Sequence, residues 1–196
     1  MFARQPIGTV TTDQLAAGAG LSRSSFYFYF SSKQAVLAAL MQNLAEDLAE
    51  GHQRWLTGTG RDDDAQREAC RHVARVWREH GPLLEQTWPG AARAGRDAEG
   101  AAPDTTEAHA DYAAVVAELD ASRARFINRL AARITRERSA GLAPGGIPAR
   151  QLALMVESLR TARFAELRGR SDARGDAAAV ADVVRATNLL LYGLLD

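Results

Sequence analysis

Residues 11–37 of the 196-residue chain read TTDQLAAGAGLSRSSFYFYFSSKQAVL, and the expected architecture follows from this stretch. Gln14 stands three residues after Thr11, which is the spacing of a capping box, so a short helix is predicted to begin there. Gly20 suits the left-handed residue that ends a helix, and Ser22 suits the N-cap of the next helix. Two short helices joined by a tight turn containing a glycine form a helix-turn-helix.

The second predicted helix carries five aromatic residues in a row, from Phe26 to Phe30. Their alternation also suits a strand, but a run of only five residues between two capping serines favours a helix. On a helix Phe26 and Phe30 are one turn apart and pair on the buried face. Tyr27, Phe28 and Tyr29 then point elsewhere, and exposed aromatic side chains at this density indicate a binding surface.

The chemistry of this surface suits double-stranded DNA. Tyrosine hydroxyls donate to phosphate oxygens, and Phe28 suits the methyl group of thymine. Arg23, Ser24 and Ser25 stand at the start of the helix, where a helix-turn-helix reaches base edges, and arginine suits guanine. Lys33 is the single lysine beside 23 arginines and lies at the start of the next predicted helix. A phosphate bound at that helix N-terminus explains it, and an ordinary solvated charge is the alternative.

The rest of the chain is predicted to be a helical bundle, so the fold class is all-α with an N-terminal helix-turn-helix. Alanine is abundant, β-branched residues are sparse, and glycine and proline gather at a few breaks such as residues 141–148. Helices are predicted over residues 32–55, 63–80, 105–139, 149–169 and 177–195. We place a DNA-binding domain at residues 1–45 and a ligand-binding and dimerisation domain at residues 46–196.

Composition argues against several classes of protein. Lys and Arg together number 24, as do Asp and Glu, so any nucleic-acid surface is local. The single cysteine, Cys70, excludes an intrachain disulfide and a zinc site built on a cysteine pair. Because the chain has no long apolar run and no apolar leader, we expect a cytoplasmic protein without a membrane partner. We find no catalytic motif and no metal-ligand set, so we expect neither an enzyme nor a cofactor or metal.

The stretch over residues 11–37 resembles the DNA-binding signature of the TetR family of bacterial repressors. The shared pattern is a helix, the AGLS turn, an aromatic recognition helix and F-x-S-K at the start of the next helix. The resemblance implies that phosphates are contacted by Thr11 or Thr12, Tyr27, Tyr29 and Lys33. It implies that the bases are faced by Arg23, Ser24, Ser25 and Phe28. The family has a full first helix before this motif, whereas only MFARQPIG precedes Thr9, so we expect a shortened first helix.

Residues 120–196 are more loosely similar to the subgroup of that family that contains a repressor of ethionamide activation. The similarity lies in RERSAGLAPGGIPARQLAL between two predicted helices and in the apolar ending NLLLYGLL. It implies an apolar small-molecule effector bound among the helices. By position in the subgroup, the candidates for this pocket are Phe126, Leu130 and Ser158.

Three further residues are candidates for the effector pocket. Trp77 and Trp88 are large aromatic side chains that suit an apolar cavity, although each also suits an ordinary core. Asn188 lies within an apolar run, so it is either a polar anchor for the effector or a satisfied core amide.

The last predicted helix is apolar over more than one core-facing stripe, so we expect a second subunit to cover part of it, together with residues 150–168. The leading hypothesis is a homodimeric repressor that binds a palindromic operator and is released by an apolar effector. The two half-sites would lie about one helical turn of DNA apart. The alternative is a helical protein that binds or sequesters small molecules without DNA-binding activity.

Overall fold

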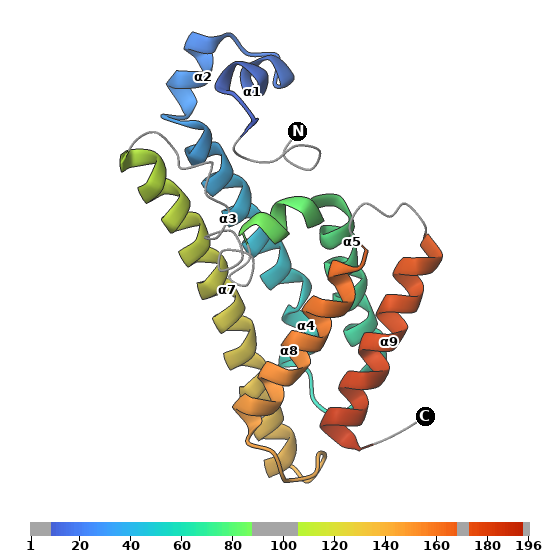
Figure 1. Ribbon diagram of the computed structural model, residues 1–196. Helices are drawn as coiled ribbons and strands as arrows, with labels where there is room; N and C mark the ends of the chain where they lie inside the picture. The colour runs from blue at the N-terminus through green and yellow to red at the C-terminus, as the bar shows by residue number, and fades with distance from the viewer. Residues whose placement is uncertain (1–8, 88–105, 168–172, 194–196) are drawn as a thin grey trace, which may run out of the picture. The chain divides into compact units, whose positions relative to one another are not determined.

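The computed structural model describes residues 9–87, 106–167 and 173–193. Within these ranges the chain forms eight helices and no strand, which confirms the all-α prediction (Figure 1). The chain divides into two compact units, Met1–Glu46 with Pro82–Ala121, and Asp47–Gly81 with Ser122–Asp196. None of the helices in the described ranges is long and apolar enough to cross a lipid bilayer.

The first unit contains the predicted helix-turn-helix. Helix α1 spans Thr12–Gly18 and helix α2 spans Arg23–Tyr29. Gly20 has a φ of +69°, the left-handed conformation expected for the residue after a helix. The amide of Leu21 donates to the carbonyl of Ala16 at 2.9 Å, which closes the end of α1 in a Schellman motif.

Both short helices are capped as the sequence predicts. The Thr11 hydroxyl accepts from the Gln14 amide at 3.2 Å, and the Gln14 side chain accepts from the Thr11 amide at 2.9 Å. The Ser22 hydroxyl accepts from the Ser25 amide at 3.0 Å at the start of α2. These caps satisfy amides that have no partner within the helix, so short-range signals are enough to define α1 and α2.

The single helix predicted over residues 32–55 is in fact two helices. Helix α3 spans Lys33–Gly51 and helix α4 spans Gln53–Thr57, with the break at His52. The Nδ1 atom of His52 donates to the carbonyl of Leu48. This side-chain hydrogen bond lies at the point where α3 ends and α4 begins.

Helix α5 spans Asp63–Thr87 and runs through Gly81 and Pro82, where the sequence analysis wrongly placed its end. A proline inside a helix removes a backbone hydrogen bond and costs about 3 kcal/mol. Leu83 and Leu84 follow directly and are each 1% exposed. Burying a leucine side chain contributes roughly 1.5–3 kcal/mol, so two buried leucines outweigh one proline and the helix continues.

Three longer helices complete the chain. Helix α7 spans Thr106–Ser139, helix α8 spans Ala149–Ala165, and helix α9 spans Ala173–Tyr192. The break between α7 and α8 falls over residues 141–148, as predicted.

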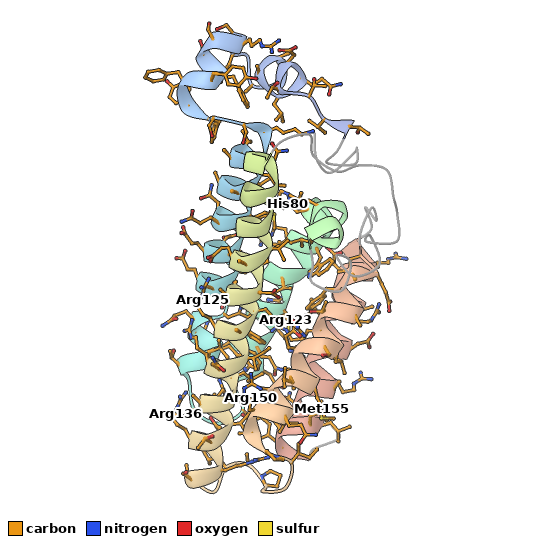
Figure 2. All side chains as sticks on the ribbon, turned by 60° about the vertical axis from the view of Figure 1, so that its left-hand side comes forward. His80, Arg123, Arg125, Arg136, Arg150 and Met155 are labelled. Atoms are coloured by element: carbon orange, nitrogen blue, oxygen red, sulfur yellow. The ribbon has the colours of Figure 1, made fainter. Side chains whose placement is uncertain are left out.

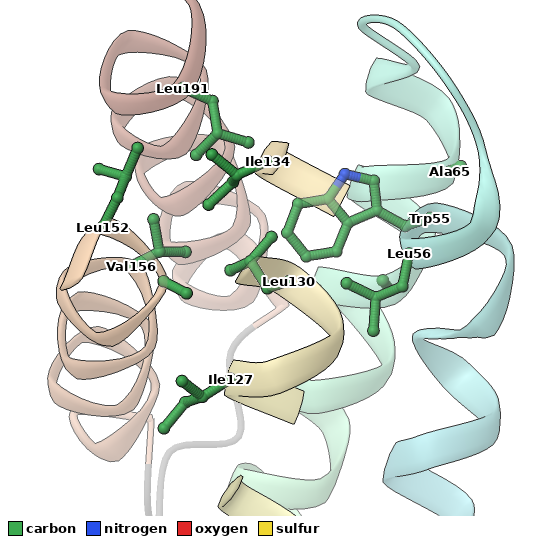
Figure 3. Close-up of a cluster of buried hydrophobic side chains, with 11 residues drawn as sticks. Trp55, Leu56, Ala65, Ile127, Leu130, Ile134, Leu152, Val156 and Leu191 are labelled. Carbon is green, nitrogen blue, oxygen red and sulfur yellow. The ribbon is translucent and has the colours of Figure 1, made fainter. Parts of the chain in front are cut away.

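The core of the second unit is an apolar cluster in which side chains of α7 face those of α4 and α8 (Figure 3). Its members are buried, and α5 and α9 also contribute to it. They are Trp55, Leu56, Ala65, Ala69, Ile127, Leu130, Ile134, Leu152, Ala153, Val156 and Leu191.

A buried arginine fastens the connection between α4 and α5 to α7. Arg133 is fully buried, and its guanidinium carbon Cζ lies 5.6 Å from the centroid of the Trp55 ring. Its Nη2 donates to the carbonyl oxygen of Gly60 at 2.6 Å. Glu137 forms an ion pair with Arg133 at 3.6 Å, and its two oxygens accept from the Gly60 amide at 2.8 and 3.0 Å. Both backbone groups of Gly60 are therefore held by side chains of one helix.

Candidate nucleic-acid interface and effector site

The exposed side of α2 carries the aromatic residues predicted to touch DNA. Phe26 is 3% exposed, and its ring centroid lies 5.9 Å from that of Phe30, which confirms the expected pair. Tyr27, Phe28 and Tyr29 are 46%, 82% and 66% exposed. A seven-residue helix that presents three large aromatic side chains to solvent has a surface suited to a binding partner.

Polar side chains gather at the N-terminus of α2. The hydroxyl of Ser22 lies 2.9 Å from that of Ser24 and 2.8 Å from that of Ser25. Arg23 is exposed, and its Nη1 lies 3.3 Å from Oδ2 of Asp13 on α1. An ion pair between two exposed side chains contributes little, so Arg23 can exchange this carboxylate for a base edge or a phosphate at small cost.

The remaining predicted phosphate contacts lie at helix starts. Thr11 is the N-cap of α1, and Thr12 is its first residue. Lys33 begins α3, and its Nζ donates to the carbonyl of Val10 at 3.0 Å, which ties the start of α3 to the segment before α1. The contacts of these three residues with DNA stay predictions.

Two of the predicted effector residues come together on α7. Leu130 is fully buried in the apolar cluster, and Phe126 packs against that cluster. Ser158 is exposed on α8, so the structure does not bring it to these two residues. Trp77 is buried on α5 without being a member of the cluster, and Trp88 lies outside the described residues.

Asn188 is hydrogen-bonded inside the second unit. It is 5% exposed, and its Nδ2 donates to Oδ1 of Asp63 at 3.0 Å. The hydrogen bond from Arg61, with a smaller contribution from Asn188, lowers the pKa of the Asp63 carboxyl. This geometry corresponds to a satisfied core amide, which was the alternative to a ligand anchor.

A cleft of about 380 Å³ opens in the second unit but contains none of the predicted effector residues. Its lining is mostly polar and includes Arg54 and Glu68, which form an ion pair at 2.9 Å. Gly51 also lines the cleft, and a Cβ atom there would lie 2.6 Å from the ring of His72. These features do not suit an apolar effector.

A buried polar cluster lies beside Phe126, and the sequence analysis missed it. Arg160 on α8 is 6% exposed, and its guanidinium lies 4.2 Å from the centroid of the Phe126 ring. His52 is also 6% exposed, and its ring centroid lies 4.8 Å from that of Phe126. Arg160 continues the four-residue spacing of the buried Leu152 and Val156, and this position on an apolar stripe was the signal that could have found it.

The imidazole of His52 is held in its neutral form. Burial lowers the pKa of His52 well below its ordinary value, and the positive charge of Arg160 lowers this pKa further. The Nδ1 atom donates to the carbonyl of Leu48, while Nε2 accepts from Nη2 of Arg160. Only the neutral ring has one donor and one acceptor, so the hydrogen bonds agree with the direction of the shift.

Family models match both parts of the chain. Residues 1–40 match the model of bacterial regulatory proteins of the tetR family, which defines a helix-turn-helix regulator. Residues 66–188, more than half of the chain, match the C-terminal domain of the transcriptional regulator EthR. The chain therefore belongs to the TetR family of bacterial regulatory proteins, in the group with an EthR-type C-terminal domain.

Individual relatives agree with this assignment. The HTH-type transcriptional regulator EthR of Mycolicibacterium smegmatis is 34% identical over 161 residues, which cover 80% of this chain and 66% of that relative. The TetR-family regulator PfmR from Thermus thermophilus has a TM-score of 0.63 at 19% identity, over 97% of this chain and 92% of that one. FadR from Bacillus subtilis, in complex with stearoyl-CoA, has a TM-score of 0.55 at 16% identity, over 98% and 93%. The two solved structures show the fold alone.

We predict that the His52→Gln protein loses less stability than the natural protein when the pH falls from about 7 to about 5. In the unfolded chain the His52 imidazole has a pKa of about 6.5, whereas in the folded chain it stays neutral to a lower pH. Below about pH 6.5 only the unfolded state gains the proton, so the free energy of unfolding falls by up to about 1.4 kcal/mol per pH unit. Urea unfolding at several pH values measures the difference.

His80→Gln is the matched control for this titration, because His80 is a half-buried histidine on α5 (Figure 2). His80→Gln measures the effect of losing one histidine elsewhere in the chain, and the pH dependence of His52→Gln is compared with it. If the stability of His52→Gln has the same pH dependence as that of the natural protein, the conclusion that the His52 imidazole is buried in its neutral form is wrong.

Proposed function

We propose that this protein is a homodimeric transcriptional repressor that binds a palindromic operator and is released from it by an apolar small-molecule effector. The observation that carries the proposal is the exposed side of α2, where Phe28 is 82% exposed between two exposed tyrosines. Two such helices, one from each subunit, would enter major grooves about 34 Å apart on one face of the duplex. The partner is double-stranded DNA in the cytoplasm, and no enzymatic step is part of the proposal.

The residues of the first unit divide into two roles in this proposal. Phosphate contacts position the protein without reading sequence, whereas contacts with base edges specify the operator. We assign phosphate contacts to Thr11, Thr12, Tyr27, Tyr29 and Lys33. We assign base contacts to Arg23, Ser24, Ser25 and Phe28.

The effector part of the proposal rests on α7 and on a structural neighbour. Phe126 and Leu130 lie together on α7 at the apolar cluster of the second unit. FadR, which shares the fold, binds stearoyl-CoA, a ligand with a long apolar chain. An effector releases the operator only to the extent that it binds the DNA-free conformation more tightly than the DNA-bound one.

The dimer part rests on α8 and α9. Much of the apolar band predicted on the last helix is covered within the chain itself, since Val183, Val184 and Leu191 are buried. Leu189 on α9 remains 40% exposed, and Met155 on α8 remains 42% exposed (Figure 2). These two side chains are the apolar contacts that we assign to a second subunit.

We predict that Arg23→Ala weakens binding to the operator by about 1–3 kcal/mol and relaxes the preference at one base pair, because arginine pairs with guanine in the major groove. We expect Lys33→Ala to weaken binding to all sequences alike and to lower the salt slope by about one, because it removes one phosphate contact. Fluorescence anisotropy with labelled promoter fragments at several salt concentrations measures both effects.

The matched control is Arg150→Ala, since Arg150 is an exposed arginine at the start of α8 in the second unit (Figure 2). We expect it to bind DNA as the natural protein does. Absence of salt-dependent binding by the natural protein would contradict the repressor and favour a helical protein that only binds small molecules. An unchanged salt slope in Lys33→Ala would contradict its phosphate contact alone.

We predict that Leu189→Asp shifts the protein from dimer to monomer, because a carboxylate at an apolar interface is left without a partner. Analytical ultracentrifugation of the natural protein and of the variant measures the mass. The control is Leu142→Asp, since Leu142 is 51% exposed in the connection between α7 and α8. A dimer that persists in Leu189→Asp, or a natural protein that is monomeric, would contradict the assigned interface.

A further inference from the structure

The two buried arginines of the second unit differ in how their charges are compensated. Arg133 has the carboxylate of Glu137 at 3.6 Å. Arg160 forms no ion pair within 4 Å among the described residues; its Nε makes no hydrogen bond there, as is also true of the Nε and Nη1 of Arg133. Within the described parts of the chain, its guanidinium donates one hydrogen bond, to the neutral ring of His52. Among the residues that the structure describes, Arg160 is therefore a buried cation without a directly bonded anion.

The charge of Glu157 raises the pKa of Arg160, but this carboxylate is already engaged by other groups. Glu157 lies three residues before Arg160 on α8, but its oxygens accept from Nη2 of Arg123 at 2.8 Å and from the hydroxyl of Thr161 at 3.0 Å. Figure 2 shows Arg123 on α7. Burial raises the pKa of the Cys70 thiol, so that neighbour stays uncharged at neutral pH. Within the described residues, the positive charge of Arg160 therefore has no carboxylate of its own.

A guanidinium cannot remove this charge by losing its proton. Burial lowers the pKa of Arg160, but arginine remains protonated in proteins. Leaving a buried charge unpaired is strongly unfavourable, and such a group is stabilised by an anion that reaches it. A planar guanidinium matches the two oxygens of a carboxylate, and the single negative charge of a carboxylate compensates the single positive charge of Arg160.

We infer that Arg160 binds the carboxylate of an amphipathic effector whose apolar body lies along Phe126 and α7. The Phe126 ring is in contact with the Arg160 guanidinium and with the apolar cluster, so one side chain joins the charged position to the apolar one. A phosphate dianion would bring an excess negative charge close to Glu157. This inference rests on the proposed function, because it assigns a chemical class to the effector of that same site.

The test uses the full chain and pairs of compounds that differ only in charge: octanoate, decanoate and dodecanoate, each beside its methyl ester. We expect at least one acid to bind with an affinity about tenfold or more above that of its ester, because hydrogen bonds to charged groups are stronger than those between neutral groups. In Arg160→Met this preference falls to about one while the ester still binds. Isothermal titration calorimetry measures the affinities, and circular dichroism checks that the variant is folded.

Two variants keep the test decisive. Arg163→Met removes a half-buried arginine of α8 that pairs with Asp182, and we expect it to keep the preference for the acid. If Arg160→Met does not fold, Arg160→Lys takes its place in the test. This variant keeps the charge without the planar fork, so we expect it to show an intermediate preference for the acid.

Three outcomes are distinguishable. If no acid is preferred over its ester, or if the preference survives in Arg160→Met, the inference is overturned, while salt-dependent operator binding still supports the repressor. If the acid is preferred but operator binding is absent, the recognition of a carboxylate stands and the proposed repressor fails. If the preferred acid also lowers the affinity for the operator, both stand.

Discussion

The second unit depends on how it holds buried guanidinium groups. Charge inside a helical bundle is costly, so each buried arginine must be met by backbone, ring or carboxylate partners. Arg133 and Glu137 hold Gly60 from both sides, which fixes the connection between α4 and α5 against α7. Arg160 meets His52 at the point where α3 ends and α4 begins. Two irregular points of the backbone thus each lie beside a buried arginine.

The first unit follows a different principle, in which local signals suffice. Thr11 and Ser22 cap their helices through hydrogen bonds over three residues, and Gly20 adopts the one conformation that the turn requires. The caps and the turn define these helices through local hydrogen bonds. The aromatic side chains on the outer side of α2 therefore remain exposed to a binding partner. In the proposed repressor the interior of one unit holds the effector and the surface of the other reads DNA. Differential affinity of the effector for two conformations links them.

The sequence was sufficient where the determining contacts are close in the chain. The helix-turn-helix, the long helix α7 and the break after it were predicted correctly, because caps, periodicity and glycine act locally. The end of α5 was predicted wrongly because the burial of Leu83 and Leu84 outweighs Pro82, and burial is not visible locally. Arg160 was missed because its importance lies in what surrounds it, including His52, which lies 108 residues away in the chain.

The most direct measurement is the nuclear magnetic resonance signal of the Arg160 Nε–H group, assigned by its loss in Arg160→Met. Decanoate is titrated into the isotope-labelled protein while this signal and that of Arg133 are followed. The account predicts that the Arg160 signal moves downfield and that its exchange with water slows, while Arg133, whose charge Glu137 already compensates, stays unchanged. A bound decanoate that leaves the Arg160 signal unchanged would contradict the account.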